Sequence, residues 1–86
     1  MLEDIAMRLD MLQHALAAHE FSKMDRPAMR VGVVADQIGL TEVSIAASHV
    51  SACLAQNDGI ALDATMARLE RGFDMAVTEV WNFREL

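Results

Sequence analysis

The sequence contains one cysteine, one proline and no tyrosine, and each scarcity limits what the chain can build. Because Cys53 is the only cysteine, no disulfide can form within the chain, and a reducing compartment is the simpler assumption. The scarcity of proline, together with abundant alanine and methionine, favours helices over sheet. Basic residues are also scarce, since seven Lys and Arg stand against thirteen Asp and Glu. The resulting net charge of −6 disfavours binding to nucleic acid and to anionic lipid.

Long apolar runs are absent as well. No run approaches the length of about 20 residues that a membrane-spanning helix needs. Met1 is followed by acidic residues rather than by the basic and apolar segments of an export signal. We therefore expect a cytoplasmic protein that does not enter a membrane. Its 86 residues suffice for one core, so residues 1–86 are expected to form a single domain.

Four segments carry apolar residues at helical spacing. They begin near Leu2, near Asp25 or Arg26, near Thr41, and near Asp58 or Asp63; the first ends near His19 and the second at Gly39. Residues 20–25 read as a short connection or an extra turn of helix, with Phe21 and Met24 as its apolar side chains. Thr41 is expected to cap the third helix. The stripe of the last helix is the longest, and it consists of Leu62, Met66, Leu69, Phe73, Ala76, Val77 and Val80.

Amphipathic helices with short connections can bury their stripes only against one another. The sequence therefore predicts an all-α fold, an antiparallel four-helix bundle with a short extra turn or connection near residues 20–25.

The second helix has two different faces. Pro27, Val31, Val34, Ala35 and Ile38 gather on one side and read as core. The other side carries Met29, Gly32, Val33 and Asp36. A surface helix normally carries Lys, Glu or Gln at such positions, so this exposed face is a candidate for contact with a partner.

The same segment carries a resemblance to a known family. Ala28 to Leu40, AMRVGVVADQIGL, is similar to the motif A-H-x-L-K-G-x-A-x-x-[IL]-G-[AL] of histidine-containing phosphotransfer (HPt) domains, without a gap. The preceding AAHEFSKMDRPAM also resembles the family's run into the phosphorylated helix, as do the following hairpin and long last helix. The matching positions are Ala17, Glu20, Phe21, Ala28, Ala35, Ile38, Gly39 and Leu40. The resemblance implies an HPt-like four-helix bundle of a two-component phosphorelay.

The differences from the motif fall on its chemistry. Met29 occupies the place of the phosphorylated histidine, Gly32 that of the lysine and Val33 that of the glycine. A thioether cannot accept a phosphoryl group as an imidazole nitrogen does. No ammonium group remains to stabilise phosphoryl oxygens, and valine adds bulk where glycine permits close approach. The chain is thus expected to be a degenerate HPt-like domain without phosphotransfer activity.

Other chemistry finds little support in the sequence. His14, His19 and His49 lack the lysine and glycine of the motif, and we expect ordinary surface imidazoles. Their spacing also fits no metal site. A phosphate-binding glycine loop, a nucleophile motif and a catalytic carboxylate pair are all missing. We expect no enzyme activity, no cofactor and no metal.

A DNA-binding helix-turn-helix is a weaker interpretation of VADQIGLTEVSIAASHV. Ser48 falls where that motif requires an apolar residue, and the would-be recognition helix from Thr41 to Leu54 has no Lys or Arg. Phosphate contacts provide most of the affinity for nucleic acid, so we expect no binding to DNA.

These observations predict a function in binding. The expected partner is a receiver domain or a sensor kinase of a two-component system, bound through Met29, Arg30, Gly32, Val33 and Asp36. The alternative is a structural bundle that forms a homodimer through methionine-rich faces, such as the one that Met7 and Met11 form on the first helix.

Overall fold

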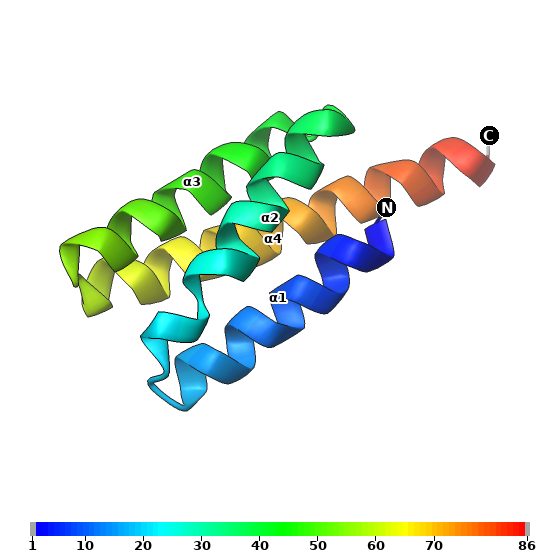
Figure 1. The fold of residues 1–86 in the computed structure, drawn as a ribbon. Coiled ribbons are helices and arrows are strands. Elements are labelled where there is room, and N and C mark those ends of the chain that lie inside the picture. Colours follow the sequence, from blue (N-terminus) through cyan, green and yellow to red (C-terminus); the bar gives the residue numbers. More distant parts are fainter. Residues whose placement is uncertain (1, 86) are drawn as a thin grey trace.

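The computed structural model describes the backbone of residues 2–85 and the side chains of residues 2–79. Over this part the chain forms four α-helices and one short 3₁₀ helix, without a strand. The elements are α1 (Leu2–Ala17), η1 (Phe21–Lys23), α2 (Asp25–Gln37), α3 (Thr41–Gln56) and α4 (Gly59–Glu85). Successive helices run in opposite directions (Figure 1). The all-α fold, the four helices and the extra turn near residues 20–25 are therefore confirmed.

Three helices end in the same backbone motif. His19, Gly39 and Asn57 adopt left-handed conformations, with φ of 56°, 80° and 55°. In each turn the next amide donates to a carbonyl five residues earlier, as Glu20 N does to Ala15 O at 2.8 Å. This Schellman pattern satisfies carbonyls that the helix leaves free. It ends α1 at Ala17, earlier than the spacing of apolar residues predicts, because His19 takes the conformation usually given to glycine.

The helix starts differ in how they are capped. The prediction that Thr41 caps α3 is wrong, because Leu40 holds the capping position without a side-chain hydrogen bond and Thr41 is already helical. Asp58 does cap α4, since its Oδ1 accepts a hydrogen bond from the Ala61 amide at 3.1 Å. In α1, a backbone amide donates to the Glu3 carboxylate and lowers the pKa of Glu3 below its usual value.

One apolar core joins the four helices. The fully buried side chains include Ile5, Leu12, Met24, Met66, Leu69, Val31, Val43 and Val50. Phe73 is also buried, as the stripe of the last helix predicts, while Val77 packs against the core and is partly exposed. The side chain of Val80, from the same stripe, lies outside the described residues. Of the two apolar residues in the connection, Met24 is buried but Phe21 remains 41% exposed.

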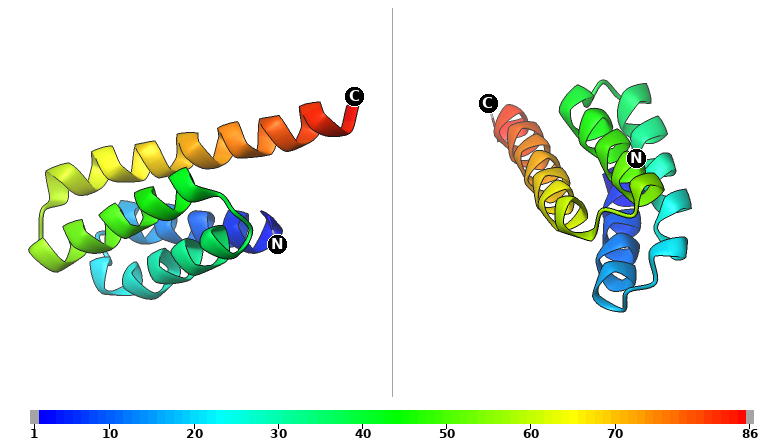
Figure 2. Two further views of the ribbon diagram at one scale, coloured as in Figure 1. Left: turned by 90° about the horizontal axis from the view of Figure 1, so that it is seen from above. Right: turned by 90° about the vertical axis from the view of Figure 1, so that its left-hand side faces the viewer.

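In both views of Figure 2, α4 lies along one side of the bundle and the other three helices lie on the opposite side. Close packing follows the chain, α1 against α2, α2 against α3 and α3 against α4. The 27-residue α4 is the longest helix and reaches past its neighbours at its C-terminal end (Figure 2). In the described part of the chain, no helix combines the length and apolar character that crossing a membrane requires.

Two branched aliphatic residues of α4 provide a test of the core. Leu69 is fully buried and Ile60 is 89% exposed. Leu69→Ala should lower the free energy of unfolding by about 2–5 kcal/mol, because it removes buried surface and leaves a cavity. Ile60→Ala, the matched control, should change it by less than about 0.5 kcal/mol. Urea denaturation measures both, and similar midpoints for the two variants would contradict the packing of α4.

Candidate functional site

The site begins where α2 and α3 cross. Gly32 of α2 faces Ala47 of α3, and a Cβ placed on Gly32 would lie 3.7 Å from the Ala47 Cβ and 4.0 Å from the Ser44 carbonyl oxygen. Small residues at this crossing allow the two backbones to approach closely. Larger side chains of both helices line a groove over this contact.

This α2–α3 groove has a volume of about 480 Å³. On α2 its wall carries the apolar Met29 and Val33, which remain 57% and 47% exposed, and the Asp36 carboxylate. The wall on α3 is polar and consists of hydroxyl groups. The complete lining is Ala28, Met29, Gly32, Val33, Asp36, Ser44, Ala47, Ser48 and Ser51.

Four of the five residues proposed from the sequence come together in this groove. Met29, Gly32, Val33 and Asp36 line it. Arg30 does not, although its side chain is exposed on the same helix. Gly32 is half-buried at the helix crossing, so it belongs to the floor of the groove rather than to a freely exposed face.

The opposite wall of the groove, on α3, was not predicted from the sequence. Ser44, Ser48 and Ser51 follow one another at steps of four and three and therefore share one face of α3. Their spacing was available in the sequence, yet serine is common on helix surfaces and its chemistry alone indicates no partner. These serines become candidates for contact with a partner because the packing of α2 on α3 places them in one groove with Met29 and Val33.

The lining of the groove combines polar groups with apolar surface. Its lining offers hydroxyl groups, one carboxylate from Asp36, a thioether and aliphatic surface. An imidazole or a basic side chain is missing from this lining. The apolar wall can be buried against a partner, while the serine hydroxyls can donate or accept hydrogen bonds at its edge.

All three histidines lie outside the groove. His14 Nδ1 is 2.8 Å from the Asp10 carbonyl oxygen and 3.5 Å from its carboxylate. The ring of His19 meets Phe21 edge to face, with centroids 5.8 Å apart. His49 is exposed and lies beside Arg68 between α3 and α4. The side chains of residues 2–79 include no cluster of three or more metal-binding groups.

Cys53 lies apart from the groove, near the α3–α4 turn. It is partly buried, and its Sγ is 3.6 Å from the Thr65 hydroxyl. Thr65 donates to the Ala61 carbonyl oxygen at 2.5 Å. Cys53 also lines a small hollow of about 200 Å³ together with Phe21 and Leu62. Asn57 and Asp58 of the α3–α4 turn line the same hollow.

Comparisons of the chain with protein-family models, with curated proteins and with solved structures find no match. The resemblance to HPt domains therefore depends on the motif residues themselves.

Two glycines of the hairpin should respond oppositely to alanine. At Gly32 a Cβ would make ordinary contacts, so Gly32→Ala should raise the free energy of unfolding by about 0.5–1 kcal/mol through lower flexibility of the unfolded chain. At Gly39, where φ is +80°, Gly39→Ala should lower it by about 1 kcal/mol or more. Thermal denaturation followed by circular dichroism tests both. Destabilisation by Gly32→Ala would show a tighter crossing than the structure has.

Proposed function

We propose that the chain is a degenerate HPt-like domain that functions by protein binding in two-component signalling in the cytoplasm. Its partner is a receiver domain or a sensor kinase, held in the α2–α3 groove. One observation carries the proposal: Met29 and Val33, two apolar residues at the positions where the HPt motif has its histidine and glycine, remain 57% and 47% exposed on one wall of a groove.

The groove suits a protein surface because of its shape and its chemistry. Met29 and Val33 present aliphatic surface whose burial contributes roughly 1–3 kcal/mol, the scale of a modest interface hot spot. Ser48 and the other α3 serines provide a polar rim, which typical interfaces place around an apolar centre. A helix or a loop of a partner can therefore bury the α2 wall and hydrogen-bond along the α3 wall.

Binding without transfer follows from the residues at the motif positions. The Met29 thioether provides no nucleophilic nitrogen, and Gly32 provides no ammonium group. The proposed domain is therefore not an enzyme. It would occupy the surface of a receiver domain or a kinase without passing on a phosphoryl group.

Self-association is the alternative. Met7 and Met11 lie four residues apart on α1 and are 53% and 47% exposed, so they form a second apolar surface away from the groove. Methionine adapts to varied partner surfaces, which suits a homodimer contact. This alternative predicts a structural role in which α1 is buried in the dimer.

Val33→Glu tests the groove as a binding surface. It should weaken binding to a receiver domain or kinase by at least about tenfold, because a carboxylate would be desolvated in the complex. Thermal stability should change little, since the Val33 side chain is 47% exposed in the free domain. Met11→Glu is the matched control, with equal exposure of 47% on α1. Isothermal titration calorimetry against a panel of receiver domains and kinases measures the affinities.

Two results would contradict this assignment. Unfolding of Val33→Glu would mean that Val33 is part of the core. Unchanged binding by Val33→Glu, with loss of binding or of self-association in Met11→Glu, would move the interaction surface to α1.

The chemistry at the motif positions gives a separate prediction. Wild-type protein incubated with a phosphorylated receiver domain should acquire no acid-labile, base-stable phosphoryl label, because Met29 cannot form a phosphoramidate. The triple variant Met29→His, Gly32→Lys and Val33→Gly should acquire such a label on the new histidine. Wild-type label that disappears in His14→Ala or His49→Ala would show that the acceptor has moved. Failure of the triple variant across a broad panel of receivers would remove the support for an HPt-like scaffold.

A further inference from the structure

A second surface lies on α4, away from the α2–α3 groove. Arg68, Gly72, Met75 and Glu79 follow one another at steps of four, three and four, and therefore form one stripe along the helix. Met75 is 62% exposed, and the side chains of Arg68 and Glu79 are exposed as well. We call these four residues the α4 stripe.

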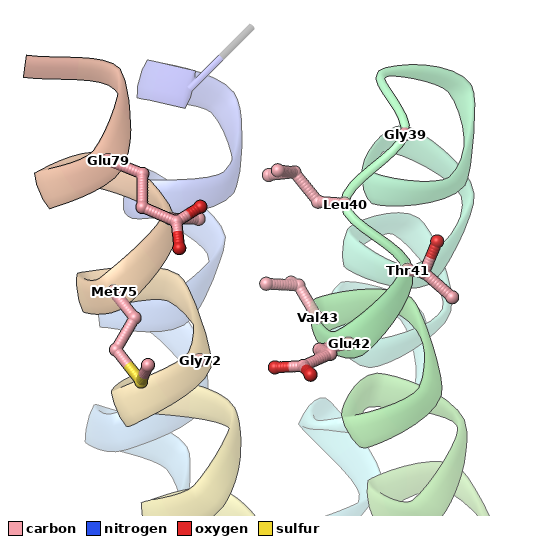
Figure 3. Close-up of a pocket in the computed structure, with 9 residues that line it drawn as sticks. Gly39, Leu40, Thr41, Glu42, Val43, Gly72, Met75 and Glu79 are labelled. Carbon is pink, nitrogen blue, oxygen red and sulfur yellow. The ribbon is translucent and has the colours of Figure 1, made fainter. Parts of the chain in front are cut away.

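The α4 stripe borders a hollow in which α3 forms the other wall. At Gly72 the two helices are close, since a Cβ there would lie 3.8 Å from the Val43 Cγ2. Two cavities of about 360 and 210 Å³ share Glu42 and Gly72 and together form an α3–α4 groove. Figure 3 shows Glu42 and Glu79 directed into the gap between the helices, with Met75 beside Gly72. Ile45 of α3 adds apolar surface, being 51% exposed.

The α4 stripe is complementary to a second α4 stripe that runs in the opposite direction. Arg68 and Glu79 are equally far from the midpoint of the stripe, which falls between Phe73 and Asp74, and so are Gly72 and Met75. In an antiparallel pair of stripes, Met75 of one therefore lies opposite Gly72 of the other. Arg68 of one likewise lies opposite Glu79 of the other. An isologous dimer requires this kind of self-complementary surface, because each contact occurs twice about the two-fold axis.

We infer that a second copy of this chain packs on the α4 stripe, with the two α4 helices antiparallel. Met75 of each copy enters the hollow beside Gly72 of the other, next to Ile45. Arg68 of each copy faces Glu79 of the other. At 1.5 Å per residue, these two charges lie about 16 Å apart along one helix, so both pairs form together only in the antiparallel arrangement.

Charge complementarity favours a second copy of the chain as the partner, and it favours the antiparallel orientation. Within the side chains that the structure describes, neither Arg68 nor Glu79 forms an ion pair. A parallel arrangement would set like charges against each other, which is unfavourable. His49 and Arg68 line one of the two cavities, Glu79 lines the other, and Glu42 borders both. The net charge of −6 per copy opposes association at long range, but this repulsion is screened beyond about 8 Å at physiological salt.

This dimer is independent of the proposed function. The α2–α3 groove has its own lining, and none of the α4 stripe contributes to it. A dimer formed through α4 can therefore present two α2–α3 grooves, and failure of either proposal leaves the other standing.

Charge reversal tests the arrangement without touching the core. Arg68→Glu and Glu79→Arg should each weaken the dimer by at least about tenfold in sedimentation velocity, because both symmetric pairs become repulsive. An equimolar mixture of the two variants should form heterodimers. One charge pair then sets the introduced Glu at position 68 against the introduced Arg at position 79, and the other keeps Arg68 against Glu79. Both substitutions in one chain should restore the homodimer. Arg26→Glu on α2 is the control, with the same change of charge away from the stripe.

Several results would overturn the inference. They are a wild-type protein that stays monomeric from micromolar to millimolar concentration, a dimer that neither charge reversal weakens, and a mixture that does not associate. A dimer dissociated by Met11→Glu but not by Arg68→Glu would assign self-association to α1. Met75→Asp provides a second variant on the exposed stripe and should also give monomers. Circular dichroism melts confirm that each variant is folded, as expected for residues outside the core.

Discussion

The close approach of α2 and α3 at Gly32 and Ala47 is the contact on which the rest of the arrangement depends. A Cβ on Gly32 would lie 3.7 Å from the Ala47 Cβ, so the two helices pack closely here with small residues between them. Met29 and Val33 line the groove beside this contact and remain 57% and 47% exposed, although they are apolar. Pro27, Val31 and Val34 occupy the opposite side of α2 and fill the core. One face of α2 therefore contributes to the core, and the other contributes to the α2–α3 groove.

A glycine also lies at a close contact between α3 and α4. Gly72 brings α4 close to Val43 of α3, and the exposed Met75 and Ile45 flank that contact. The packing of α1 against α4 is different. These helices are not among the closely packed pairs, and Leu9 and Phe73 line a hollow of about 240 Å³ between them. The bundle is thus closely packed from α1 to α2, α2 to α3 and α3 to α4, and wider between α1 and α4. Both proposed interaction surfaces lie along the tight helix pairs, where small residues create hollows between neighbouring helices.

Much of this fold was predictable from the sequence, because apolar spacing determines which face of a helix is buried. The spacing gave the four helices, the buried face of α2 and the burial of Phe73. It could not locate the end of α1, since His19 adopts a left-handed conformation that sequence patterns assign to glycine or asparagine. It also assigned the α3 cap to Thr41 rather than Leu40, because threonine is the commoner capping residue. The serine wall of the groove was missed because facing surfaces on two helices become visible only once their crossing is known.

The position of α3 explains why its outer surface carries so little charge. Glu42 is the only Asp, Glu, Lys or Arg in Thr41–Gln56, whereas α2 and α4 carry several. α3 forms a wall of both grooves, with serines toward α2 and with Ile45 and His49 toward α4. A charged side chain on either wall would have to lose its hydration when a partner covers the groove, at a considerable free-energy cost. α3 has no charged side chain toward α2 and only Glu42 toward α4, so its composition keeps that cost low on both sides and fits the two proposed protein contacts.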